Sequence, residues 1–511
     1  MSLVLDKIIE NASKNPERVA YICEEQSITW KELDEKSNKL ASYFLETLSD
    51  KTPVVVYGHK HPFMIVAFLA CVKSGRAYVP VDITFPNKRI SDVIEAVNPE
   101  IVLTVDNNLP VETAKRILEV LEFEWEGNEE SSLPSDCGVK GEDVHYIIFT
   151  SGSTGTPKGV QITADCLDNF VKWAITLGSE KIMEGDKHLT FINQAPFSFD
   201  LSVFDLYLSL YTGGTLYTIP KAMQSDMKNL YAYLGKSGAN VWVSTPSFAE
   251  IATSDECFSK ELLPELKLFL FCGETLTNQT AKKLYDRFPK AEVVNTYGPT
   301  ESTVAMTEIV VTDDVMEKYN PLPIGNVKPG TYVYIMDEDG NILPDEEKGE
   351  IVIVGDTVSV GYWNNPEKNA EVFGTMNIDG VEYRLYHTHD KGYYKDGVLF
   401  YCGRIDLQIK LHGYRIELED IESNILAVSN VERVVVMPDY SEANEVIGLT
   451  AYVVSKEKIE SALKERSRIR KALESRIPEY MIPKKFVFKD SLPVTNNGKV
   501  DRRKLREQEE C

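Results

Sequence analysis

The spacing of apolar residues in the first part of the chain predicts helices. Leu5, Ile8 and Ala12 fall on one face of a helix, and residues 30–45 repeat the same spacing. Residues 61–74 are apolar on nearly every side, which is typical of a helix buried inside a large domain. Helices of this kind need further elements to pack against.

Short apolar runs bounded by turn residues predict strands between these helices. Two runs near the N-terminus, 19–23 and 26–29, suggest a hairpin. Later runs alternate with helical segments, which implies a parallel sheet covered by helices. These predicted strands are 53–58, 78–81, 101–104, 144–149, 189–192, 215–219, 241–244, 268–271 and 293–296.

The pattern changes near residue 321, where the strands become shorter and are separated by Gly/Asp turns. Strands are predicted at 333–336, 350–354 and 398–401, and a helix at 457–475. We therefore predict an α/β fold with two domains. A large N-terminal domain, residues 1–404, holds parallel or mixed sheets with covering helices plus a β-rich subdomain. A small, mobile α+β C-terminal domain comprises residues 405–511.

Composition narrows the class of protein. The 511 residues carry a formal net charge of −24, which argues against nucleic acid or an anionic membrane as the main partner. The eight cysteines form no C-x-x-C pair, which suits reduced thiols. The sequence shows neither a signal-peptide pattern nor an apolar run long enough for membrane insertion. We expect a cytoplasmic protein, and a monomer because the sequence carries no symmetric interface signature.

A loop rich in glycine and hydroxyl groups, Thr150–Val160, follows the predicted strand 144–149. Its glycines permit unusual backbone angles, and exposed N–H groups together with Lys158 would form a cradle for phosphate. Gly159 follows the lysine, so the spacing is not that of the P-loop. The alternative is a solvated linker, although linkers seldom carry a lysine directly after a strand. The hydroxyl donors are Thr150, Ser151, Ser153 and Thr154.

Asp200 lies among aromatic residues just after another predicted strand, where α/β sheets bind ligands. A carboxylate in apolar surroundings is costly unless it is paired, so a cationic ligand group is a reasonable partner. The alternative is an N-cap for a helix over 201–210. Residue chemistry alone supports these two interpretations equally.

Two further segments carry candidate nucleotide ligands. In Asn295–Glu301, Tyr297 offers a flat face for a base, Asn295 offers amide hydrogen bonds, and Glu301 offers a carboxylate for Mg²⁺. The alternative is a plain strand-to-helix turn. Further along, Asp390 suits ribose hydroxyls and Arg404 suits a phosphate. His387 and His389 lack further metal ligands nearby in the sequence, so we do not predict a metal site there.

Taken together and in this order, these segments resemble the adenylate-forming superfamily of acyl-CoA synthetases, firefly luciferase and amino-acid adenylation domains. The resemblance runs from Lys73–Asp82 to a turn that carries Lys499. Asp200 matches the aspartate with which the amino-acid branch pairs the substrate's α-ammonium, which favours the ligand interpretation over the N-cap.

Within that branch, the chain most resembles the Gram-positive enzymes that load D-alanine onto a separate carrier protein for teichoic-acid D-alanylation. Cys272 stands where most adenylation domains have glycine, which implies a pocket narrowed around a small side chain, and Val304 would line the same pocket. The segments that carry the match are Asn193–Asp200, Ser244–Glu250, Phe269–Glu274 and Gln408–Glu417.

The resemblance implies a reaction with ATP and Mg²⁺ in two halves. The amino acid is first adenylated, and a phosphopantetheine thiol on the carrier then takes the aminoacyl group. Lys499 would contact both the substrate carboxylate and the α-phosphate, Glu301 would aid Mg²⁺, and Asp406 would be the hinge of a rotating C-terminal domain. The remaining implied ATP ligands are Thr150, Ser151, Thr154, Lys158, Asn295, Thr296, Tyr297, Gly298, Pro299, Thr300, Asp390, Tyr401 and Arg404.

One position departs from the family pattern. The usual Thr-Gly-Asp is Thr388-His389-Asp390 here, so a side chain replaces the glycine beside the ribose-binding aspartate. If that position needs a positive φ, the change costs about 1 kcal/mol or more.

Two other functions remain as alternatives. The chain could be a stand-alone adenylation enzyme that loads another small amino acid onto a peptide-synthetase carrier, since chirality cannot be deduced from the sequence. It could also be a non-catalytic nucleotide-binding regulator. The presence of Lys499, Asp390 and Glu301 together favours a catalyst.

Overall fold

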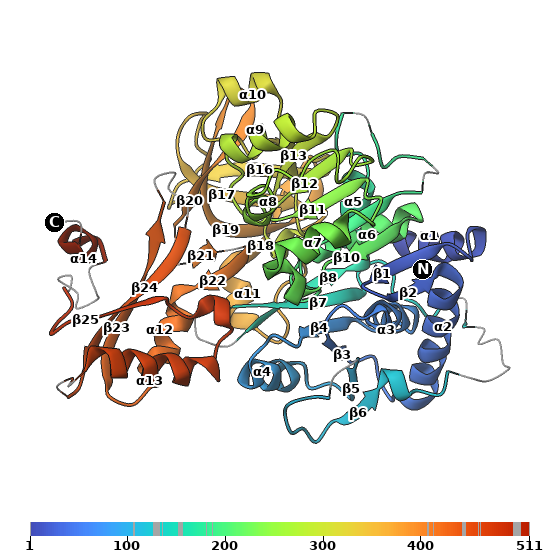
Figure 1. Ribbon diagram of the computed structural model, residues 1–511, viewed down its shortest axis with the longest axis horizontal. Coiled ribbons are helices and arrows are strands. Elements are labelled where there is room, and N and C mark those ends of the chain that lie inside the picture. Colours follow the sequence, from blue (N-terminus) through green and yellow to red (C-terminus); the bar gives the residue numbers. More distant parts are fainter. Residues whose placement is uncertain are drawn as a thin grey trace. The chain divides into compact units, whose positions relative to one another are not determined.

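The computed structural model describes residues 2–105, 108–125, 133–134, 136–151, 157–179, 181–185, 188–405, 408–411, 413–441, 446–457, 459, 461–493 and 502–509. These residues form two compact units (Figure 1). Unit 1 comprises residues 1–83, 96–149 and 159–405, and unit 2 comprises 84–95, 150–158 and 406–511. Thr154, Asp406 and Lys499, three of the predicted site residues, lie outside the described ranges.

The largest sheet of unit 1 has nine strands in the order β15-β14-β13-β12-β11-β9-β10-β1-β2. Its central strands are parallel, and β2, β14 and β15 add antiparallel edges. The strands are β1 (Val19–Cys23), β2 (Gln26–Thr29), β9 (Thr190–Asn193), β10 (Thr215–Thr218), β11 (Val241–Ser244), β12 (Leu268–Phe271), β13 (Glu292–Tyr297), β14 (Thr307–Val310) and β15 (Asn326–Val327). The mixed α/β prediction is therefore confirmed.

A second sheet has the order β6-β5-β3-β4-β7-β8. Its pairings from β6 through to β7 are parallel. The strands are β3 (Val54–Gly58), β4 (Tyr78–Asp82), β5 (Ile101–Thr104), β6 (Arg116–Glu119), β7 (Val144–Thr150) and β8 (Lys158–Thr163). Runs of buried valine and isoleucine form β3 and β5, as expected for strands covered on both faces.

Helices of unit 1 follow the predicted apolar spacing. In α3 (Pro62–Lys73) nearly every side chain is buried, which confirms a helix that is apolar all round. Thr29 and Glu32 form a capping box at the start of α2 (Trp30–Thr47). The other helices of this unit are α1 (Leu3–Lys14), α5 (Ala164–Ala174), α6 (Leu201–Thr212), α7 (Met227–Leu234), α8 (Pro246–Ala252), α9 (Asn278–Arg287), α10 (Asp313–Lys318) and α11 (Pro366–Val372).

The β-rich subdomain is an antiparallel five-stranded sheet in which β17 and β20 both pair with the long strand β19. Pairing is irregular on both sides of Asp390, which places this residue at a bulge. The strands are β16 (Thr331–Met336), β17 (Gly349–Gly355), β18 (Phe373–Ile378), β19 (Val381–Lys395) and β20 (Val398–Arg404).

Unit 2 has its own hydrophobic core around Ile416, Ile421 and Ile469. The predicted helix at 457–475 begins later, at Ala462, because Ser461 accepts a hydrogen bond from the backbone N–H of Lys464 and caps it. The elements are β21 (Gln408–Leu411), β22 (Tyr414–Glu417), β23 (Val431–Tyr440), β24 (Val446–Ser455), β25 (Lys485–Phe488), α4 (Asn87–Val97, which continues into unit 1), α12 (Leu418–Leu426), α13 (Ala462–Glu474) and α14 (Arg502–Glu509).

Candidate active site

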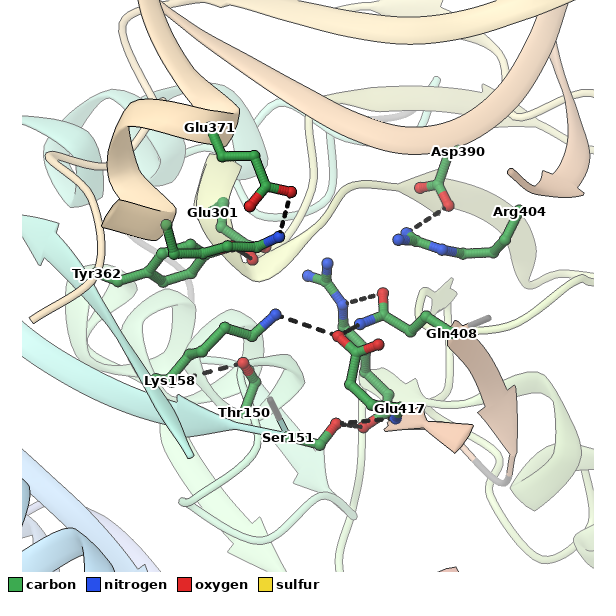
Figure 2. Close-up of polar contacts among 12 residues, drawn as sticks. Thr150, Ser151, Lys158, Glu301, Tyr362, Glu371, Asp390, Arg404, Gln408 and Glu417 are labelled. Carbon is green, nitrogen blue, oxygen red and sulfur yellow. Dashed lines mark hydrogen bonds and ion pairs between the residues drawn. The ribbon is translucent and has the colours of Figure 1, made fainter. Parts of the chain in front are cut away.

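Asp390 holds a buried carboxylate at the bulge in β19. Its Oδ1 accepts a hydrogen bond of 2.8 Å from Nη1 of Arg404, and its Oδ2 accepts one from the hydroxyl of Tyr297 (Figure 2 shows Asp390 and Arg404). Burial and the neighbouring carboxylate raise the pKa of Tyr297 well above its ordinary value, so the phenol stays protonated and donates. Each carboxylate oxygen has a second lone pair, which leaves acceptors for hydroxyl groups such as those of a ribose.

His389, directly before Asp390, has a left-handed backbone with φ of 56°. Position 389 therefore does need a positive φ, a conformation that glycine adopts at lower cost than histidine. The backbone remains bonded, since His389 O accepts from the N–H of Ile405 at 2.8 Å. The turn thus forms with a side chain in place of glycine.

The segment at the end of β13 has side chains engaged within unit 1. The amide of Asn295 donates to the carbonyl of Pro323 at 2.9 Å, and the hydroxyl of Thr296 donates to that of Phe271 at 2.8 Å. A Cβ at Gly298 would lie 2.5 Å from Cα of Ala305, so only glycine fits there. These contacts fix the strand end, which is followed by Gly298 and Pro299.

Asp200 contacts the same segment. Its Oδ2 accepts a hydrogen bond of 2.6 Å from the hydroxyl of Thr300. Asp200 occupies the position before α6, but its side chain makes no capping hydrogen bond to that helix. The N-cap alternative is therefore wrong for the side chain, although the residue stands at the N-cap position.

Cys272 lies at the end of β12 and its thiol is 3.6 Å from the carbonyl oxygen of Val304. Both side chains are buried. Thr303 and Val304 have φ of 57° and 71°, which is uncommon for residues with branched side chains. The segment from Thr300 to Val304 thus contacts the Asp200 carboxylate at one end and the Cys272 thiol at the other.

Tyr401, on β20, lies beside Tyr297 with ring centroids 5.9 Å apart. The planes are tilted by 38°. The two rings and the Asp390 carboxylate are thus neighbours, as the sequence predicts for a nucleotide site.

The described part of the phosphate loop belongs to unit 2, where it meets the hairpin of β21 and β22. Nζ of Lys158 lies 3.1 Å from Oε1 of Glu417, and both side chains are buried (Figure 2). Ser151 donates to the carbonyl of Arg415 at 2.8 Å and accepts from the N–H of Glu417 at 3.3 Å. Thr150 donates more weakly, at 3.5 Å, to the carbonyl of Lys158. Lys158 therefore already interacts with an anionic group.

Glu301 is the predicted magnesium ligand, and its chemistry suits that ion. The carboxylate is fully buried, and Oε1 accepts a hydrogen bond of 2.6 Å from the hydroxyl of Tyr362. Magnesium prefers oxygen ligands and often uses one carboxylate together with substrate phosphates. Within the described part of the chain, no group of three or more His, Cys, Asp or Glu side chains could hold a metal ion by itself. One protein carboxylate plus phosphate oxygens is thus the arrangement that fits.

Sequence patterns gave no signal for several residues that organise the site, because lysines and glutamates are normally solvent-exposed. Lys60 is buried, and its ammonium donates to the carbonyl of Gln194 at 3.0 Å and to the side chain of Asn193. Burial lowers the pKa of Lys60 to about 8. This lysine therefore anchors the start of the segment that leads to Asp200. Glu350 and Glu417 were missed for the same reason, and Tyr362 was missed because its partner Glu301 lies 61 positions away in the sequence.

The chain that adopts this α/β fold belongs to the AMP-binding enzyme family. The family's main model matches residues 8–363, and the model of the AMP-binding enzyme C-terminal domain matches residues 420–499. The D-alanine–D-alanyl carrier protein ligase of Bacillus mycoides (strain KBAB4) is 48% identical over 508 residues, covering 98% of each chain. The ligase of the same name from Bacillus cereus (strain B4264) is 47% identical over 508 residues, again covering 98% of each chain.

Solved structures share the fold. A holo-protein with adenylation and PCP domains, bound to a vinylsulfonamide inhibitor, aligns with a TM-score of 0.82 at 26% identity and covers 99% of this chain and 84% of its own. The Vibrio cholerae adenylation domain AlmE, in complex with glycyl-adenosine-5′-phosphate, also gives a TM-score of 0.82, at 21% identity, covering 100% of this chain and 98% of its own. Among the described residues, every helix is too short or too polar to cross a bilayer.

Proposed function

We propose that this chain is an AMP-forming ligase that activates D-alanine with ATP and transfers it to the phosphopantetheine thiol of a separate carrier protein. The observation that carries the proposal is the segment Thr300–Val304, which contacts both Asp200 and Cys272. A carboxylate suits an α-ammonium group, and a buried thiol leaves room for only a small side chain. The similarity to D-alanine–D-alanyl carrier protein ligases supports D-alanine as that amino acid.

In the first half-reaction, an oxygen of the amino-acid carboxylate attacks the α-phosphorus of ATP. An O–P bond forms, the bond to pyrophosphate breaks, and aminoacyl-AMP results. The Asp390 carboxylate would accept hydrogen bonds from the ribose hydroxyls. Arg404 and Tyr297 keep this side chain in position by donating hydrogen bonds to it. In such a reaction the protein mainly positions the two reactants and stabilises the charge that develops between them. Lys499 would offset charge on the substrate carboxylate and the α-phosphate.

Lys158 and Ser151 would bind the β- and γ-phosphates through an ammonium and a hydroxyl donor. Glu301 would hold Mg²⁺, which supplies Lewis-acid stabilisation of the phosphate charge when bound. In the second half-reaction, the carrier thiolate attacks the carbonyl carbon of the adenylate. A C–S bond forms, AMP leaves, and the aminoacyl group remains as a thioester.

The seven cysteines that the structure describes are free thiols, which supports a reducing compartment such as the cytoplasm. D-alanyl carrier protein formed there would serve teichoic-acid D-alanylation. We predict that the protein is a monomer and that Asp406 is the hinge between its two domains.

Intact-mass spectrometry of a holo-carrier protein tests the transfer. The chain, ATP, Mg²⁺ and D-alanine should add one alanyl group to the carrier, and an apo-carrier without the phosphopantetheine arm should gain no mass. Loading by glycine or L-alanine in preference to D-alanine would contradict the proposed substrate. It would favour the alternative of a peptide-synthetase loading enzyme.

A further inference from the structure

The bulge that carries Asp390 is held by side chains where the strand ladder is interrupted. Glu350 of β17 pairs with Lys391 of β19, and Val352 pairs with His387, so Ile351 alone lies opposite residues 388–390. Such bulges commonly re-aim a side chain next to a functional site. Strand β19 thus has two extra residues here, and the backbone groups of residues 388–390 that have no ladder partner in β17 must find other partners.

The hydroxyl of Thr388 satisfies one of these groups, the N–H of Asp390, together with the carbonyl of Ile351 opposite. Oγ1 of Thr388 donates to the carbonyl of Ile351 at 2.6 Å and accepts from the N–H of Asp390 at 2.9 Å. The bond to Ile351 ties β19 to β17 at the bulge, and the bond from Asp390 lies within β19. Neither bond touches the N–H of His389, the residue whose backbone is left-handed.

Glu350 supplies that missing partner and makes a second contact. Its Oε1 accepts a hydrogen bond of 2.8 Å from the N–H of His389, and its Oε2 lies 3.0 Å from Nδ1 of His387. Burial raises the pKa of Glu350, but the bonds from His387 and His389 outweigh it and hold the pKa below its ordinary value. The Glu350 carboxylate is thus charged and forms hydrogen bonds with the residues on both sides of Thr388.

The left-handed turn brings the next residue to the predicted ribose site. With His389 fixed through its N–H and its carbonyl, Asp390 faces Arg404 and Tyr297. Glycine would adopt this turn without strain, whereas histidine needs help to stay there. The contacts of Glu350 provide that help.

We propose that Glu350 is a positioning residue for the nucleotide: by bonding the N–H of His389 and the ring of His387, it fixes the bulge that aims Asp390 at the ribose diol. This inference rests on the proposed function, because it takes Asp390 as the ribose ligand. Glu350 itself need not touch the nucleotide.

Calorimetric binding of AMP and of 2′,3′-dideoxy-AMP tests the inference without needing the identity of the amino acid. The wild type should bind AMP more tightly than the dideoxy analogue. Glu350→Ala should weaken the binding of AMP about tenfold and leave the affinity for the dideoxy analogue almost unchanged, because only the contact with the diol is lost. Glu350→Gln keeps an acceptor for the N–H of His389 and should retain most of the affinity for AMP.

A second substitution separates positioning from general damage to the fold. In the Glu350→Ala/His389→Gly variant, glycine forms the left-handed turn unaided, so AMP affinity should return toward the wild-type value. Glu347→Ala, which removes an exposed carboxylate nearby, is the matched control and should bind both nucleotides as the wild type does. Equal weakening of both nucleotides by Glu350→Ala, or no rescue by glycine, would overturn the inference.

Asp390→Ala distinguishes this failure from failure of the proposed function. If it abolishes the preference for AMP over the dideoxy analogue while Glu350→Ala does not change it, Asp390 binds the ribose and the role of Glu350 is wrong. If Asp390→Ala keeps that preference, the ribose assignment is wrong, and the inference falls with it.

Discussion

The hydroxyl of Thr300 donates a hydrogen bond of 2.6 Å to the carboxylate of Asp200, across 100 positions of sequence. The resemblance implied a nucleotide contact for Thr300, whereas this bond connects it to the proposed ammonium partner. The two residues thus form a hydrogen-bonded pair that joins the segment after β13 to the start of α6.

Asp200→Asn should raise KM for D-alanine about 100-fold, because the substrate ammonium loses a charged partner. Thr300→Val should raise KM for D-alanine about tenfold, because the Asp200 carboxylate is less well oriented without the hydroxyl. Thr300→Ser keeps the hydroxyl and should have nearly the wild-type KM. Pyrophosphate exchange at saturating ATP gives these values. A Thr300→Val variant with a raised KM for ATP and an unchanged KM for the amino acid would assign Thr300 to the nucleotide alone.

Cys272→Gly should relax selectivity toward larger side chains, because the thiol that contacts Val304 is removed. The ratio of kcat/KM for D-valine to that for D-alanine should rise about tenfold or more, as expected for a change of one small group in a pocket. Cys272→Ser has nearly the volume of cysteine and should keep the wild-type ratio. An unchanged ratio in the glycine variant would place the side-chain pocket elsewhere.

Glu417→Gln should lower KM for ATP roughly fivefold, equivalent to about 1 kcal/mol. The reason is that phosphate must compete with the Glu417 carboxylate for the ammonium of Lys158, 3.1 Å away. Initial rates of exchange at varied ATP measure the effect, with Glu419→Gln, an exposed carboxylate on α12, as control. In a Lys158→Met background the Glu417 substitution should have no further effect. A raised KM for ATP in Glu417→Gln would mean that this carboxylate assists the nucleotide instead.

The pair of His387 and Glu350 should make stability depend on pH. The hydrogen bond that His387 donates to Glu350 raises the pKa of His387 above 6.5, despite burial, so the stabilisation by this histidine is present below pH 6.5 and is lost as pH rises through the raised value. The pKa of Glu350 lies below 4.5, so its stabilisation is present above 4.5 and is lost as pH falls through the lowered value.

The stability difference between the wild type and His387→Gln should therefore be largest between pH 4.5 and 6.5. Urea unfolding of both proteins at about pH 6 and about pH 8.5 measures this difference. A difference that is equal at both pH values, or larger at the higher one, would show that the ring of His387 does not interact as a cation.

Local patterns were sufficient for much of the fold. The all-round apolar spacing of residues 61–74 and the alternating runs from 53 to 296 predict α3 and the parallel strands, because burial on both faces leaves a direct mark on the sequence. The long antiparallel strand β19 was missed, since its exposed and bulged positions break a regular alternation.

The site could be predicted only in part. Residue chemistry alone left Asp200 ambiguous until the family resemblance favoured a ligand role, because its partner Thr300 is distant in sequence and spacing says nothing about such pairs. Glu417 lies 259 positions from Lys158, and Glu350 lies 39 from His389, so neither gave a local signal. The strain at His389 was foreseen from the missing glycine, but the carboxylate that compensates for it was not.

The most direct measurement is amino-acid-dependent ATP–pyrophosphate exchange with D-alanine, L-alanine, glycine and D-serine side by side, plus a Lys499→Ala control. Exchange strongest with D-alanine and lost in the control is the predicted result. Exchange strongest with another amino acid would contradict the proposed substrate. Exchange with none of them, in a protein that still binds ATP, would contradict the proposed adenylation of a small amino acid.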